Sequence, residues 1–174
     1  LDIFVTKNEN DYGLSPEKSF ATISAPPIQY LPPRPKSYNP KIALIGTGGI
    51  SEYHLKAYQK CGFQVVALAN RTLAKAKVLR DKYFPAASVH EDFHEILNID
   101  EIEVIDVTPH PLERLPILYD CLKTGKHVLS QKPFVLDIED GKKLADLADR
   151  KGRKIAVNQN GRWAPHFSYM RNAI

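Results

Sequence analysis

A short apolar run that ends directly in a glycine-rich turn places the strongest constraint on what this chain can fold into. Residues 42–45 read Ile-Ala-Leu-Ile, and the turn that follows is Gly46-Thr47-Gly48-Gly49-Ile50-Ser51. Four consecutive apolar residues are typical of a strand buried on both faces of a parallel sheet. Residues 50–60 then have the apolar spacing of a helix. The order predicts a strand, a tight turn and a helix, as in a β–α–β unit.

The same alternation continues along the chain. Apolar runs at 64–69, 88–89, 104–107, 127–130 and 154–158 predict five more strands, and the segments between them predict helices or short crossovers. Thr72 and Asp137 are suitable residues to cap two of these helices, and Pro111 is suitable to begin a third. Within that third helix we expect Pro116 to bend it or to delay its start. The sequence therefore predicts an α/β fold, a doubly wound and mostly parallel six-stranded Rossmann sheet.

The glycine turn has the spacing that a phosphate-binding loop needs. Gly46, Gly48 and Ser51 follow the pattern G-x-G-x-x-small, with the strand before and the helix after it. The first glycine permits the turn, the second lets a pyrophosphate approach the backbone, and the third small residue lets the helix pack on the strand. N–H groups at the helix start favour an anion. We expect a nicotinamide dinucleotide on residues 46–51; the alternative is a glycine-rich turn that binds nothing.

The end of the second predicted strand bears on the choice between NAD and NADP. An acidic residue there would bind the ribose hydroxyls of NAD, but this chain has Asn70-Arg71-Thr72. Arg71 and Thr72 suit a 2′-phosphate, whereas Asn70 also suits a plain ribose. The sequence therefore favours NADP without excluding NAD. The alternative for Arg71 is an ordinary surface arginine.

The N-terminal region differs from the rest of the chain. Six prolines crowd residues 26–40, which excludes helix and interior strand there. We expect an extended N-terminal arm over 1–40, a dinucleotide-binding domain over 41–160, and the start of a further domain over 161–174.

Composition and charge exclude several classes of function. The formal net charge is +4, but lysines and arginines are scattered, so no nucleic-acid patch is expected. No apolar stretch approaches the ~20 residues of a membrane span, and no secretory signal precedes the first strand. Cys61 and Cys121 form no metal-binding pattern. We expect buried, reduced thiols in a cytoplasmic protein without a metal site.

One further motif is more specific than the fold. Residues 125–133 read Gly-Lys-His-Val-Leu-Ser-Gln-Lys-Pro, and residues 158–165 read Asn-Gln-Asn-Gly-Arg-Trp-Ala-Pro. Together with the glycine turn, these segments resemble the Gfo/Idh/MocA family (glucose–fructose oxidoreductase, inositol dehydrogenase and rhizopine-catabolism proteins). Members typically show G-K-H-V followed by E-K-P, and here Gln131 replaces the glutamate. The resemblance extends from about residue 41 to the end of the chain.

The resemblance assigns roles to particular residues. Lys132 resembles the family lysine that lies beside the nicotinamide and orients the substrate hydroxyl; an ammonium group there can stabilise an alkoxide. Gln131 removes a carboxylate from beside that lysine, and Pro133 permits a cis peptide bond. Cofactor contacts are implied for Thr108, Pro109, Gln131, Arg162 and Trp163. His110 and Glu113 are weaker candidates, and Asp106 is interpreted as a structural carboxylate.

The family also implies a reaction and a second domain. Members are NAD(P)-dependent oxidoreductases that exchange a hydride with a CH–OH group of a sugar-like compound or polyol. Their second domain supplies most of the substrate pocket and drives oligomerisation, so we expect this chain to be a fragment with little turnover alone and a homo-oligomer at full length. The alternative function is a non-catalytic dinucleotide sensor or interaction module.

Overall fold

The computed structural model describes residues 24, 26–31 and 35–174. The expectation of an extended arm over 1–40 therefore lies largely outside the described residues, because 1–23, 25 and 32–34 are not among them. Within the described part, residues 26–30 and 35–40 contain neither helix nor strand.

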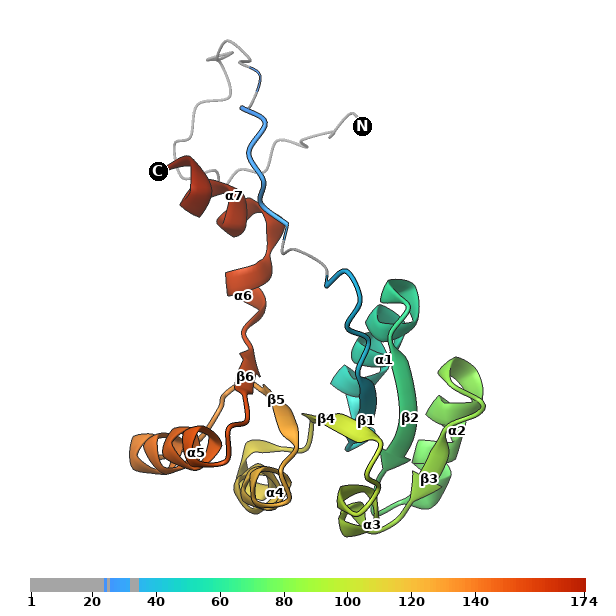
Figure 1. The fold of residues 1–174 in the computed structure, drawn as a ribbon. Helices are drawn as coiled ribbons and strands as arrows, with labels where there is room; N and C mark the ends of the chain where they lie inside the picture. The colour runs from blue at the N-terminus through green and yellow to red at the C-terminus, as the bar shows by residue number, and fades with distance from the viewer. Residues whose placement is uncertain (1–23, 25, 32–34) are drawn as a thin grey trace, which may run out of the picture.

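Six parallel strands form one sheet in the order β3-β2-β1-β4-β5-β6 (Figure 1). The strands are β1 (Lys41–Ile45), β2 (Gln64–Ala69), β3 (Ser88–His90), β4 (Ile102–Val107), β5 (His127–Gln131) and β6 (Ile155–Asn158). The chain winds outwards from β1 in both directions, so the order reverses between β1 and β4. The predicted doubly wound Rossmann sheet is confirmed, and crevices at such a reversal are the usual ligand sites.

Helices cover the sheet and extend beyond it. They are α1 (Gly49–Cys61), α2 (Leu73–Tyr83), α3 (Phe93–Leu97), α4 (Pro111–Lys123), α5 (Ile138–Arg150), α6 (Asn160–Trp163) and α7 (Pro165–Ala173). Figure 1 shows α4 and α5 side by side beneath β5 and β6, whereas α6 and α7 stand away from the sheet. None of these helices is long and apolar enough to cross a membrane.

The central strand β1 is buried on both faces, as its apolar run predicts. Ile42 and Leu44 pack in one cluster with residues of α1 and α2, whereas Ala43 and Ile45 pack in a second cluster with residues of α4 and α5. Alternate side chains of a strand point to opposite faces, so one short run contributes to both clusters. Burying a leucine of this kind contributes about 1.5–3 kcal/mol, and β1 consequently holds the glycine turn on a rigid support.

The helix ends agree with most local signals. The Asp137 side chain accepts a hydrogen bond from the Glu139 N–H at 2.7 Å and caps α5. Thr72 stands at the N-cap of α2 without a side-chain cap bond. The expectation that Pro116 delays α4 is wrong, because Pro116 lies inside the helix, which begins at Pro111. Pro111 begins the helix because proline at the first helical position already has the required φ.

One expectation about the cysteines is wrong. Cys121 is buried between α4 and the sheet, but Cys61 is exposed. Cys61 is the last residue of α1, next to the turn that Gly62 makes with φ 76°. Residues 59–61 at this end of α1 are all exposed, so the Cys61 side chain meets solvent.

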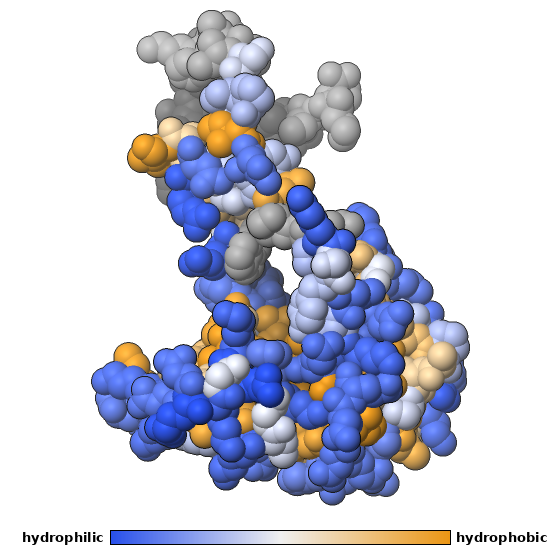
Figure 2. All heavy atoms as spheres, in the orientation of Figure 1, coloured by the Kyte–Doolittle hydropathy of each residue, from blue (hydrophilic) through white to orange (hydrophobic). Residues whose placement is uncertain are grey.

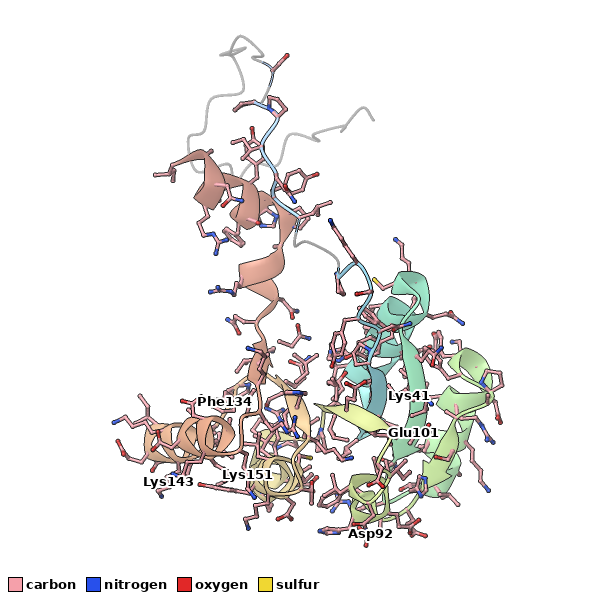
Figure 3. All side chains as sticks on the ribbon, in the orientation of Figure 1. Lys41, Asp92, Glu101, Phe134, Lys143 and Lys151 are labelled. Atoms are coloured by element: carbon pink, nitrogen blue, oxygen red, sulfur yellow. The ribbon has the colours of Figure 1, made fainter. Side chains whose placement is uncertain are left out.

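The amino-terminal edge of the sheet and the outer surface are polar. Lys41 at the start of β1 and Glu101 just before β4 form an ion pair and lie close together in Figure 3. Figure 2 shows mainly hydrophilic side chains over the visible face of the sheet body. In parallel α/β sheets ligands bind at the opposite, carboxyl edge, so side chains that contact a ligand are expected there.

The described part of the N-terminal region contacts α7. Three side chains of this helix, Ser168, Tyr169 and Asn172, donate hydrogen bonds to backbone carbonyls of residues 30, 26 and 29, at 2.6, 2.7 and 2.8 Å. The rings of Tyr30 and Tyr169 also meet edge to face, 5.9 Å between centroids. Residues 26–31 and α7 therefore form a unit beside the sheet (Figure 1).

Candidate functional site

The first glycine of the turn is required by the fold itself. Gly46 has φ +91°, and its N–H donates to the Ala69 carbonyl of β2 at 2.8 Å. A Cβ at this position would lie 2.8 Å from Thr108 Oγ1 and 3.0 Å from the Pro109 ring. The turn thus passes so close to the end of β4 that no side chain fits.

The next glycines have a different setting. A Cβ on Gly48 or on Gly49 would have no protein atom within 4 Å. Gly48 is the N-cap of α1 with φ −78°, a value open to any residue. Ser51 is fully buried beneath the turn, and its hydroxyl donates to the Gly48 carbonyl. The helix start is therefore packed on its inner side and open on its outer side.

Two side chains fix the loop from outside. Asn70, at the end of β2, accepts from the Thr47 N–H at 3.2 Å and donates to the Thr72 carbonyl at 2.9 Å. The Thr108 hydroxyl lies 3.1 Å from the Ile45 carbonyl oxygen and 3.0 Å from that of Gly46. Asn70 and Thr108 therefore hold the turn between β2 and β4.

A cavity of about 540 Å³ opens at this carboxyl edge of the sheet. Its wall includes seven of the residues predicted to touch a cofactor: Gly46, Thr47, Gly48, Asn70, Arg71, Thr108 and Pro109. Phe93 and His94 of α3 and Pro116 and Ile117 of α4 also line the wall. Asp92, labelled in Figure 3, caps α3 by accepting from the His94 N–H at 2.9 Å.

Several charged side chains line the cavity wall near Arg71, and this part is called its charged end. Arg71 Nη2 lies 2.6 Å from Glu113 Oε1, and Glu91 and Asp120 line the same wall. The His94 side chain pairs with Asp92, and this hydrogen bond raises the pKa of His94. The Arg71 guanidinium and the His94 imidazole therefore each have a carboxylate partner here.

The segment that carries Lys132 is held by a buried arginine. The Arg114 guanidinium, 2% exposed, donates to the carbonyls of Pro109, Gln131 and Pro133. Burial lowers the pKa of Arg114, and three carbonyl acceptors take the place of a carboxylate partner. Arg114 thus joins the cavity wall at Pro109 to the end of β5. The Lys132–Pro133 peptide bond is cis, and the Lys132 side chain is exposed.

A second polar group lies beneath the turn, on the α1 side of the sheet. Asp106 of β4 is fully buried, and its Oδ2 lies 2.6 Å from His54 Nδ1 and 2.8 Å from the Tyr58 hydroxyl. Burial, with the Asp106 charge adding to it, raises the pKa of Tyr58 well above its ordinary value. Tyr58 therefore remains a hydrogen-bond donor to this carboxylate.

The remaining predicted site residues lie elsewhere. Ile50 borders a separate hollow of about 470 Å³ between α1 and β6. Within the described part of the chain, Thr72 does not line the larger cavity. Arg162 and Trp163 belong to α6, beyond the end of β6.

Sequence reasoning did not identify Arg114 or His54. Arg114 follows Pro111 inside a helix, where an arginine is usually solvent-exposed, and His54 is a single histidine on an amphipathic helix. Arg114 lies 17 residues from its partner Gln131, and His54 lies 52 residues from Asp106, so no local pattern contains these pairs. A search of the described residues finds no group of three or more His, Cys, Asp or Glu side chains arranged to hold a metal ion.

A parallel sheet with this strand order and a glycine turn between β1 and α1 defines a Rossmann dinucleotide-binding fold. Comparison with known proteins makes the assignment more specific. Residues 40–159 match the Gfo/Idh/MocA model, described as an oxidoreductase family with an NAD-binding Rossmann fold. This match covers more than half of the chain, and the chain belongs to that family.

Two of the similar proteins are inositol dehydrogenases. An inositol 2-dehydrogenase/D-chiro-inositol 3-dehydrogenase of Lactiplantibacillus plantarum is 27% identical over 137 residues, 77% of this chain and 39% of that protein. The NADP-dependent scyllo-inositol 2-dehydrogenase of Bacillus subtilis is 35% identical over 98 residues, 56% of this chain and 27% of that protein. This chain thus spans well under half the length of either relative.

A solved structure shows the same fold. The WlbA dehydrogenase from Chromobacterium violaceum, in complex with NADH and UDP-GlcNAcA, superposes with a TM-score of 0.72. The match covers 83% of this chain and 42% of that one at 20% identity.

Proposed function

We propose that this chain is the cofactor-binding part of an NAD(P)-dependent dehydrogenase that acts on a CH–OH group of a polyol or sugar-like compound. In domain terms, residues 41–160 form the cofactor domain and 161–174 begin the next domain. The observation that carries the proposal is the link made by Arg114. Its guanidinium joins the wall of the cavity beside the glycine turn to the segment that carries Lys132.

The residues around the turn fit a dinucleotide. The hydroxyl of Thr47 is buried in the cavity wall and is one of two buried side-chain polar atoms without a partner in the described residues. The outer side of Gly48 and Gly49 leaves space for another molecule beside the backbone. The first N–H groups of a helix have no partner within it, so those of α1 would hold a pyrophosphate. Ser51 would support the turn from below.

The charged end of the cavity would hold the adenosine ribose, with a preference for NADP. Arg71 is 83% exposed and its pair with Glu113 is only partly shielded from water. Such exposed pairs contribute about 0–1 kcal/mol, so the Arg71 guanidinium can exchange Glu113 for a 2′-phosphate, which it binds more strongly. Asn70 is already engaged by the turn, which leaves Arg71 as the main determinant.

Lys132 would act on the substrate. Arg114 fixes the carbonyls on both sides of this residue, while the ammonium group itself is free to reach out of the sheet. When a nicotinamide is bound, it accepts the hydride from the substrate carbon or returns it. The Lys132 ammonium would donate a hydrogen bond to the substrate oxygen and stabilise negative charge that develops there. Pro109, Thr108, Arg162 and Trp163 would border this end of the cofactor.

Calorimetric titration of the chain with NAD and with NADP tests the binding part of this proposal. We expect both to bind, NADP more tightly. Arg71→Ala should weaken NADP about tenfold or more, as loss of a charge-assisted hydrogen bond implies, and should change NAD binding less. Arg150→Ala, at the exposed end of α5, is the matched control and should leave both affinities unchanged.

A nicotinamide reduction assay with inositols and sugars tests the catalytic part, and it is made on the full-length protein because little turnover is expected of this chain alone. Reduction that is lost in Lys132→Ala and retained in Lys151→Ala supports the proposed reaction. Dinucleotide binding without reduction by any polyol would instead favour a dinucleotide-sensing module. Failure to bind either dinucleotide would refute both functions.

A further inference from the structure

A continuous hydrogen-bond chain connects the buried Asp106 to the backbone of Lys132. Beyond the bond from Asp106 to His54 Nδ1, the other ring nitrogen, His54 Nε2, lies 3.0 Å from Gln131 Nε2 and 2.9 Å from Asn158 Nδ2. Gln131 Oε1 then accepts from the Lys132 N–H at 2.7 Å. His54 is 8% exposed and Gln131 4%, so water competes little with these bonds.

The backbone N–H of Lys132 determines the proton positions along this chain. A backbone N–H is always a donor, so the Gln131 atom facing it must be the oxygen. The Gln131 amide nitrogen therefore faces His54 and donates to Nε2. Nε2 can accept only in the neutral ring, and the proton of that ring lies on Nδ1, where Asp106 accepts it. His54 is thus a neutral imidazole with its proton on Nδ1.

We propose that His54, oriented by Asp106, is a positioning residue for Lys132. Its bare Nε2 holds the Gln131 amide in the one orientation that places Oε1 on the Lys132 N–H. This inference rests on the proposed role of Lys132 at the substrate. Arg114 holds the carbonyls of Gln131 and Pro133, so these two acceptors and the Lys132 N–H are held by buried side chains.

The amide of Gln131 is needed for this hydrogen-bond chain. An amide supplies its own donor to His54, whereas a glutamate would offer two acceptor oxygens. With Gln131→Glu, one carboxylate oxygen would still accept from the Lys132 N–H, and the other would require a proton on Nε2. The ring would then be an imidazolium between two carboxylates. Two titratable groups face His54: Asp106 of β4 contacts it directly, and Tyr58 of the same helix α1 donates to the same Asp106 carboxylate. The uncharged side chains of Gln131 and Asn158 contact it from β5 and β6.

The nitrogen resonances of His54 test the proton assignment. Long-range ¹H–¹⁵N correlation spectra of ¹⁵N-labelled protein distinguish a ring with one bare nitrogen from a ring protonated on both. At neutral pH we expect a protonated Nδ1 and a bare Nε2 in the unaltered chain, and protons on both nitrogens in Gln131→Glu. A doubly protonated ring in the unaltered chain would overturn the proposal.

Amide hydrogen exchange at Lys132 tests the positioning role. His54→Asn retains a donor near the Nδ1 position but has no group at Nε2, whereas His54→Gln retains an acceptor near Nε2. Exchange of the Lys132 amide should accelerate about fivefold in His54→Asn, since one hydrogen bond is worth roughly 1 kcal/mol, and substantially less in His54→Gln. His166→Asn on exposed α7 is the control and should match the unaltered chain.

The outcomes are separable from those of the proposed function. Equal Lys132 exchange in His54→Asn, His54→Gln and the unaltered chain, with all three folded, would refute the positioning role. Both measurements are made without dinucleotide. Failure of NAD and NADP to bind would refute the proposed function but would not change the interpretation of the spectra. A doubly protonated His54 ring would refute the positioning role but would not change the binding result.

Discussion

Arg71 at the end of β2 and Glu113 in the first turn of α4 form an ion pair of 2.6 Å across the cavity wall. The guanidinium that the sequence assigns to a 2′-phosphate is thus already paired with a carboxylate. Any anion that binds there must compete with Glu113. With Arg71 in its proposed role, the pair would link cofactor choice to a residue 42 positions along the chain.

We predict that Glu113→Gln increases NADP affinity several-fold and changes NAD affinity less. Removing the carboxylate frees Arg71 and also removes its repulsion of a phosphate, and one charge interaction of this kind contributes about 1 kcal/mol. Parallel titrations with the two dinucleotides measure the effect. Glu139→Gln, an exposed carboxylate on α5, is the control, and an unchanged NADP affinity in Glu113→Gln would show that the pair does not restrict binding.

The two glycines of the turn should respond differently to alanine. Gly46→Ala forces a side chain into φ +91° and against Thr108 and Pro109, so we expect a loss of about 2 kcal/mol or more in the free energy of unfolding. Gly48→Ala meets no protein atom and should leave that free energy within about 0.5 kcal/mol, yet weaken dinucleotide binding at least about tenfold. Urea unfolding and calorimetry measure the two quantities. Tight binding in a folded Gly48→Ala variant would contradict the proposed pyrophosphate position.

Arg114 should be important for stability although it has no carboxylate partner. Arg114→Met would leave the carbonyls of Pro109, Gln131 and Pro133 without their donor. Since an unsatisfied buried polar group costs about 1–3 kcal/mol, we expect the free energy of unfolding to fall by about 3 kcal/mol. Arg114→Lys should recover only part of this, because one ammonium cannot match the spread of the guanidinium donors. A urea midpoint for Arg114→Met equal to that of the unaltered chain would disprove this role.

His127 should make stability fall on mild acidification. Its Nδ1 accepts from the Lys154 N–H at 2.9 Å, and burial, with the Arg153 charge adding to it, lowers the pKa of His127 below its ordinary 6.5. As the pH falls, the unfolded chain therefore takes up this proton at a higher pH than the folded chain. The contribution of His127 to the free energy of unfolding is complete above pH 6.5 and is lost as the pH falls through the folded pKa. His127→Asn keeps an acceptor near Nδ1 and should show a smaller loss in urea midpoint down to about pH 5.

His94 provides the opposite sign as a control for this measurement. The Asp92 hydrogen bond raises the pKa of His94 above its ordinary 6.5. The contribution of His94 to the free energy of unfolding is complete below pH 6.5 and is lost as the pH rises through the folded pKa. His94→Gln should therefore reduce the loss of stability above pH 6.5, where His127→Asn has little effect. Equal pH profiles for the two variants would contradict both assignments.

The sequence was sufficient for the parts of the fold that local rules determine. The apolar run before Gly46 and the alternation of strand and helix signals predict six strands in a doubly wound, mostly parallel sheet. Strands buried on both faces require such apolar runs. The glycine spacing also predicts that the ligand site lies at the carboxyl edge of the sheet. These features depend on residues within a few positions of one another.

The parts that could not be predicted depend on contacts between distant residues. Asp106 was interpreted as a structural carboxylate, which agrees with its burial, but its partners His54 and Tyr58 lie 52 and 48 positions away. The pairing of Arg71 with Glu113 similarly joins β2 to α4. Arg114 offers no signal at all in sequence, since its acceptors are backbone carbonyls, which every residue has.

The contact between α7 and residues 26–31 has a consequence for how the two partners can vary. Every hydrogen bond that the structure gives for this contact is donated by a helix side chain and accepted by a backbone carbonyl. The helix therefore recognises the path of the segment rather than its side chains, Tyr30 excepted. Across orthologues, we expect Ser168, Tyr169 and Asn172 to be retained while the residues they hold drift in identity, an asymmetry of evolutionary constraint within a single interface.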